Sequence, residues 1–346
     1  MACLTIGLDA TSSDGGGSPS STAAPSSGRA TPEVTSEPST ERPTSPVSSA
    51  PEHLEHLEDA FDKLGVASEL LAHWEVLENK VFGTEAQELK DGAEPSMPSK
   101  VRGAALWCLQ QILVDVGLPM EAWFDGAALL DTYLIQANKD GAAECIKRLP
   151  LVVTVIARML KKENQQECSY NYNFTAIPSW VAQHLGPLGH PVKVDQQVSC
   201  EELSQAEHGL LDTVEWRTHL PTLASWTTAF FKRLDVLSEN ARSEQIRTAW
   251  QRALLIGQVL VVKQAPTVDC SPKRMARGIL VLSVMNAEAG PAAAQQPAGR
   301  ALEAAAGATA STLQEDCRAA VAAIRRAGYN PWSVGAALEP ARPGSA

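Results

Sequence analysis

The chain has 346 residues, enough for one or two domains at roughly 150 residues each. Its net charge of −11 argues against sequence-independent binding of DNA or RNA, because such binding needs a basic face. Seven cysteines are scattered without a CxxC pair, which is typical of reduced cysteines in an intracellular protein and predicts no metal site. The start, MACLTIGLDATSS, lacks the basic region of a signal peptide, so we expect no secretion.

Residues 1–52 are dominated by Ser, Thr, Pro, Gly and Ala. A segment of this composition cannot bury enough apolar surface to offset its ordering entropy, so we expect a disordered tail. Ser18, Thr31 and Ser45 each precede a proline and are candidate phosphorylation sites, although such pairs also arise by chance in biased segments. A second, short tail is expected over 339–346.

Residues 53–99 are expected to form amphipathic helices and a linker. Apolar residues recur at steps of three and four on both sides of Gly65, which separates two helices. These residues are Leu54, Leu57, Phe61 and Leu64, then Leu70, Leu71, Trp74, Leu77 and Val81. The polar stretch 84–99, with Pro95 and Pro98, is predicted to end the second helix.

The most apolar stretch of the chain lies within 145–164, where Leu149 to Leu160 is apolar almost all round. Its length favours a buried helix over a strand, and it falls short of the roughly 18–20 residues that span a membrane. Pro150 fits the first turn of this helix, where its missing N–H is not needed. We expect a central helix wrapped by its neighbours, which are predicted at 100–116, 119–134, 178–184 and 200–215.

Two serines are predicted to begin helices. Ser199 can cap the helix at 200–215, with Glu202 completing a capping box. Ser271 opens the sequence SPKR, which matches the consensus of proline-directed kinases. The same residues match an N-cap serine followed by Pro272 at the first helical position, and this second interpretation is favoured. The Ala/Gly/Pro-rich stretch 287–309 is expected to be a loose connection. The C-terminal helices are expected at 222–237, 244–262, 271–285 and 311–327.

Four charged residues stand at positions that a known family shares. Arg102 opens the helix at 100–116, and Asp131 lies in the sequence LLDTYL. Lys162 ends the central helix, and Glu207 lies in AEHGLLDTVEWRTHLPTLASW. In this order and spacing, residues 100–234 resemble the cyclins through their N-terminal cyclin box.

The resemblance implies an all-α chain with the cyclin fold. A five-helix cyclin box is implied for 100–220, after the N-terminal helices and linker of 53–99. Residues 221–338 carry a weaker signal, and their helices suit a degenerate second cyclin-like lobe.

The resemblance also implies a function without catalysis. A cyclin binds a cyclin-dependent Ser/Thr kinase as a heterodimer, packs on the kinase's C-helix and shifts it to the active state. Lys162 and Glu207 are the implied kinase contacts, and Arg102 with Asp131 the implied structural ion pair. Cell-cycle control in the nucleus or cytoplasm would follow, with no cofactor, catalytic residue, metal, nucleic acid or membrane.

Each contact residue also has a simpler interpretation. Taken alone, Lys162 is a cation at a helix C-terminus, where it favours the helix macrodipole. Glu207 alone is a polar residue on an amphipathic helix, and Lys161 stays open as the equivalent lysine. Two other functions stay open as well: a cyclin-fold transcription factor or scaffold that does not activate a kinase, and a plain helical interaction protein.

The sequence departs from the cyclin pattern in three places, one of which is the missing second Glu after Lys162, where the chain reads Lys162-Glu163-Asn164. Ala104, Ala105 and Cys108 stand where cyclins carry larger apolar side chains, on a surface that docks Arg-x-Leu motifs. The loss of apolar area argues against that docking here. The segment from Lys162 to Glu207 is also longer than usual in cyclins, which predicts a loop over the kinase-facing side.

Overall fold

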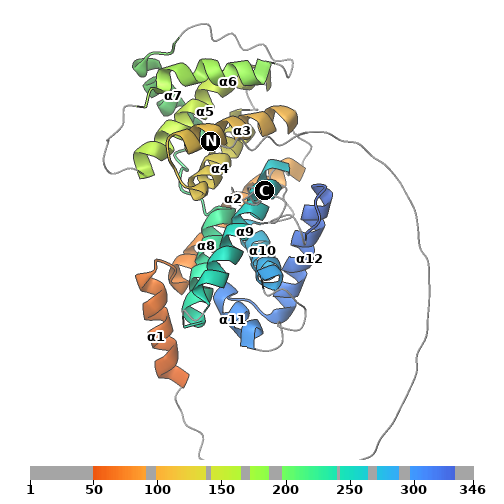
Figure 1. Cartoon of the computed structure of the whole chain (residues 1–346). Helices are drawn as coiled ribbons and strands as arrows, with labels where there is room; N and C mark the ends of the chain where they lie inside the picture. The colour runs from red at the N-terminus through yellow and green to blue at the C-terminus, as the bar shows by residue number, and fades with distance from the viewer. Residues whose placement is uncertain are drawn as a thin grey trace, which may run out of the picture. The chain divides into compact units, whose positions relative to one another are not determined.

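The computed structural model describes residues 50–90, 99–137, 142–164, 172–186, 197–239, 242–263, 271–287 and 297–331. Over these ranges the chain consists of twelve α-helices and a 3-10 turn, and no strand occurs among them (Figure 1). The predicted all-α class is confirmed. The expected tails lie outside the described residues at positions 1–49 and 339–346, whereas positions 50–52, expected to belong to the first tail, are helical. No helix in the described part of the chain has the length and apolarity needed to cross a membrane.

The first two helices, α1 (Ala50–Lys63) and α2 (Ser68–Lys90), turn at Gly65, whose φ of +66° suits glycine. The predicted end of α2 was wrong. The helix continues to Lys90 through TEAQELK, because most of these residues are strong helix formers. The polar composition of this stretch therefore does not end the helix.

The next helices form a first bundle around α5. They are α3 (Ser99–Asp115), α4 (Met120–Ala137), α5 (Ala142–Asn164), the 3-10 turn η2 (Phe174–Ala176), α6 (Ile177–Leu185) and α7 (Cys200–Thr213). Helix α5 packs against α3, α4, α6 and α7 (Figure 1). The predicted central helix and the predicted helix order are both confirmed. The long segment between Lys162 and Glu207, which was expected to form a loop, contains the turn η2 and the helix α6.

Pro150 does not begin α5, contrary to the prediction. The helix starts at Ala142, so the proline lies two turns inside it. Its missing N–H leaves the carbonyl of Ile146 without the usual helical donor. One turn later, the Thr154 hydroxyl donates to the Pro150 carbonyl at 2.8 Å. Burial of the surrounding apolar residues holds the helix continuous across this defect.

Gly126 of α4 lies where three helices meet closely. A Cβ atom at this position would stand 2.8 Å from Cδ1 of Leu160 and 2.9 Å from Cδ2 of Leu109. Glycine reduces helix propensity, so its presence would weaken a helix considered alone. Here it allows α4 to approach α3 and α5 closely.

A second bundle follows the first. It contains α8 (Leu223–Leu237), α9 (Ser243–Lys263), α10 (Pro272–Ala287), α11 (Pro297–Ala306) and α12 (Ala310–Arg326). Helix α10 packs against α8, α9 and α12 (Figure 1). The expected loose connection at 287–309 was wrong for α11, because PAGRALEAAA is alanine-rich and alanine is the best helix former.

The two bundles contact each other through α3 and α4 on one side and α8 and α9 on the other. Helices α1 and α2 attach to the second bundle. Arg233 of α8 lies 4.3 Å from the Phe61 ring of α1, and its guanidinium donates to the Ser68 hydroxyl at the start of α2. Trp74 of α2 meets Trp226 of α8 edge to face, with 5.4 Å between ring centroids.

Candidate partner interface

The two predicted contact residues meet at the C-terminal end of α5. The Lys162 ammonium donates to both carboxylate oxygens of Glu207 on α7, at 2.8 and 2.7 Å. The lysine side chain is 52% exposed, whereas that of Glu207 is 18% exposed. The pair therefore presents its cation to solvent while the carboxylate is largely shielded between the helices.

Arg158, one turn before Lys162 on α5, adds a second cation to the site. Its Nη1 lies 3.6 Å from Oε2 of Glu207, and both terminal nitrogens lie 3.4 Å from the Ser204 hydroxyl. One carboxylate thus faces two cations, so the site carries a net positive charge. Arg158 was not among the predicted site residues, although a lone arginine within a buried run was a signal for it.

The structure distinguishes between the two candidate lysines. Lys161 points to the Tyr172 ring, with its ammonium 5.2 Å from the ring centroid. Lys162, and not Lys161, pairs with Glu207. The one-residue difference turns the side chains about 100° apart around the helix, so only one of them can face α7.

Helix α7 is held in place by its N-terminus and its apolar face. The Ser199 hydroxyl accepts from the amide of Glu202, and the Glu202 carboxylate accepts from the amide of Ser199. This capping box confirms the prediction, and its hydrogen bonds lower the pKa of Glu202. Leu203 and Leu210 are buried against the bundle, which leaves Glu207 on the flank that faces α5.

The predicted structural pair also forms. Arg102 of α3 donates to both carboxylate oxygens of Asp131 on α4, at 2.6 and 2.7 Å. The side chains are 9% and 14% exposed. Arg102 also donates to the carbonyl of Val261 at 2.9 Å, near the C-terminal end of α9. Burial raises the pKa of Asp131, and the arginine opposes that shift.

The residues that depart from the cyclin pattern are mostly internal. Ala105 and Cys108 are fully buried in the core. Trp107 instead lies at the surface, 5.9 Å from the Trp180 ring and 5.1 Å from the His184 ring of α6. This aromatic contact joins α6 to α3.

A further carboxyl group lies where α4 meets the start of α8. Asp125 accepts a 3.2 Å hydrogen bond from the hydroxyl of Thr222, the residue that N-caps α8. Burial raises the pKa of Asp125 to about 6, while the Thr222 hydrogen bond opposes the shift. Nearby Glu163 raises it further, and Glu163 also lies 4.0 Å from His219.

No family model matches the sequence, and no curated protein matches it. Within the described residues, no group of His, Cys, Asp or Glu is arranged to hold a metal ion.

Proposed function

We propose that this chain is a cyclin-type regulatory subunit that binds and activates a cyclin-dependent Ser/Thr kinase, in cell-cycle control. Helices α3 to α7 would be the cyclin box, and α8 to α12 a degenerate second lobe. The observation that carries the proposal is the meeting of Lys162 and Glu207, far apart in sequence, across α5 and α7. The helix order, the central α5 and the Arg102–Asp131 pair support it.

The proposed contact works by exchange of partners. An ion pair with an exposed lysine contributes only about 0–1 kcal/mol, so Lys162 loses little when it turns toward an acceptor on the kinase. Glu207 does not become an uncompensated carboxylate in that state, because Arg158 stays beside it. The pair can therefore open without leaving a partly shielded charge alone.

Activation follows from preferential binding. If α5 and α7 fit the kinase C-helix only in its inward position, binding shifts the kinase population toward that state. In that state the kinase's own Lys–Glu ion pair forms. In this mechanism the cyclin-type chain supplies no reacting group. It supplies a rigid surface whose charges match one of two kinase conformations.

The test is affinity capture of a kinase by the full chain, followed by an activity assay of the captured complex. We expect the wild-type chain to recover an active Ser/Thr kinase, and the double variant Lys162→Ala/Glu207→Ala to lose it. The matched control is Glu144→Ala/Lys147→Ala, which removes an exposed ion pair at the opposite end of the same helix.

Three outcomes would contradict the proposal. The first is that the wild-type chain recovers no kinase, and the second is that the double variant recovers as much kinase as the control does. The third is that a kinase is captured but is no more active than the kinase alone, which would make the chain a scaffold and not an activator. Thermal unfolding of each variant checks that loss of capture is not loss of fold.

A further inference from the structure

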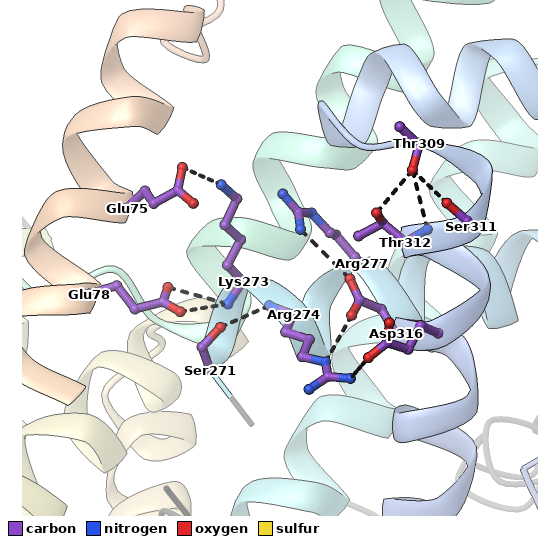
Figure 2. Close-up of polar contacts among 11 residues, drawn as sticks. Glu75, Glu78, Ser271, Lys273, Arg274, Arg277, Thr309, Ser311, Thr312 and Asp316 are labelled. Atoms are coloured by element: carbon purple, nitrogen blue, oxygen red, sulfur yellow. Dashed lines mark hydrogen bonds and ion pairs between the residues drawn. The ribbon is translucent and has the colours of Figure 1, made fainter. Parts of the chain in front are cut away.

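The N-terminus of α10 already holds an anion, the carboxylate of Glu78. This residue comes from α2, is 4% exposed, and accepts from the backbone amide of Lys273, with both oxygens at 3.3 Å. The indole N–H of Trp226 donates to the same carboxylate at 2.7 Å. Figure 2 shows Glu78 pointing from α2 at the first turn of α10. Helix amides and the macrodipole explain why a carboxylate settles there.

Ser271 stands at the same point, the N-terminus of α10. Its hydroxyl oxygen accepts from the amide of Arg274 at 3.2 Å, which caps α10 as predicted. Burial raises the pKa of Glu78, and the Ser271 side chain opposes that shift. Ser271 and Glu78 therefore share the first turn of α10.

The side chains that follow Ser271 are already paired. The Lys273 ammonium lies 2.6 Å from Oε2 of Glu75, one turn before Glu78 on α2. Arg274 is bound to α12 through Asp316, at 2.9 Å (Figure 2), and through Glu315, at 2.7 Å. The lysine therefore fastens α2 to α10, whereas the arginine fastens α12 to α10.

The sequence sets Ser271 apart from the other serines and threonines that precede proline. There are four such pairs in the chain, at Ser18, Thr31, Ser45 and Ser271. Only Ser271 also has a basic residue three positions later, Arg274. Ser271 is partly exposed and lies at a helix terminus, where the first turn frays most readily.

We propose that Ser271 is a phosphorylation site for a proline-directed Ser/Thr kinase, and that its phosphorylation releases α2 from the second bundle. In the reaction the Ser271 oxygen forms a bond to the γ-phosphorus of ATP. The bond between that phosphorus and the bridging oxygen breaks, ADP leaves, and the hydroxyl proton passes to the kinase's base.

Phosphorylation acts on two of the contacts that hold α2, that of Glu78 with the α10 amide and that of Glu75 with Lys273. Glu78 then faces a group carrying about −1.5 to −2 charges at the same helix terminus. The phosphoryl group competes for the α10 amides and draws the Lys273 ammonium away from Glu75. Like-charge repulsion next to a buried carboxylate then favours the detached helix.

The experiment treats the full chain with a purified proline-directed kinase and ATP. Mass spectrometry locates the phosphate, and hydrogen exchange follows the α2 amides around Glu75 and Glu78. We expect phosphate on Ser271. The α2 amides should then exchange about tenfold faster or more, because losing one hydrogen bond to a charged group changes the opening equilibrium by about that factor. Amides of α5 should exchange at their former rate.

Two variants separate the charge effect from a change in the cap. Ser271→Asn keeps an uncharged N-cap but takes no phosphate, so kinase treatment should leave its α2 exchange unchanged. Glu78→Gln keeps the acceptor oxygen without the charge, so phosphorylation should release α2 much less in this background. The inference is overturned if the tail sites are phosphorylated and Ser271 is not. It is equally overturned if phosphorylated Ser271 leaves α2 exchange unchanged, or if Glu78→Gln responds as the wild type does.

Discussion

In the first bundle, the Arg102–Asp131 and Lys162–Glu207 ion pairs have carboxylates of similar exposure and cations of very different exposure. Asp131 and Glu207 are 14% and 18% exposed. Their partners differ: Arg102 is 9% exposed and binds both carboxylate oxygens, whereas the Lys162 side chain is 52% exposed. Exposure of the cation, more than that of the acid, therefore separates the pair that is shielded between helices from the pair whose cation lies open to solvent.

The largest expected effect comes from breaking the buried pair. Asp131→Ala leaves the Arg102 guanidinium without its bidentate partner, and we expect a loss of about 3–5 kcal/mol in the free energy of unfolding. Urea denaturation measures it. The double variant Arg102→Met/Asp131→Leu should be less destabilised than Asp131→Ala, because it leaves no unpaired charge. A single variant as stable as the wild type would show that this pair is not structural.

Asp125 supplies an intermediate case, a shielded carboxyl whose hydrogen-bond donor is a neutral threonine. Its pKa of about 6 lies above the ordinary 3.8, mainly because of burial. The folded state therefore binds the proton more tightly than the unfolded chain does. The stability that this provides is fully present below about pH 4 and is lost as the pH rises through 6.

The variant Asp125→Asn removes this titration. Between pH 4 and 7 we expect the wild type to lose up to about 3 kcal/mol relative to the variant, and urea denaturation at several pH values measures the difference. A difference that is constant with pH would place the pKa of Asp125 at its ordinary value.

The smallest effect on stability is expected at the exposed pair. Lys162→Ala leaves Glu207 beside Arg158, so the free energy of unfolding should fall by no more than about 1 kcal/mol. Capture of the kinase should nevertheless fall sharply. A loss comparable to that of Asp131→Ala would make Lys162 a structural residue and remove the contrast between the two pairs.

Local patterns in the sequence were enough to predict most helices. The length of a continuous apolar run predicted the central helix α5, and the Ser199–Glu202 spacing predicted a capping box that the structure confirms. These features depend on residues within one or two turns of each other. The two ion pairs were placed by the resemblance, not by spacing, since each joins separate helices.

What the sequence did not predict depends on distant contacts. Arg158 and Glu78 become part of a site only when α5 meets α7 and α2 meets α10. Pro150 was misplaced because burial overrides its usual position at a helix start, which no local pattern reports. Gly126 lowers the intrinsic helix propensity of α4, whereas in the fold its missing side chain is what permits close packing.

The reach of Arg102 to the Val261 carbonyl has a consequence for how the chain can be divided. A fragment ending at position 220 would strip Arg102 of that acceptor and Asp125 of its Thr222 donor. Polar groups satisfied across the junction would then have only solvent as a partner. We therefore expect the two bundles to melt in one cooperative transition, and excision of the first bundle to yield a fragment less stable than that bundle is within the whole chain.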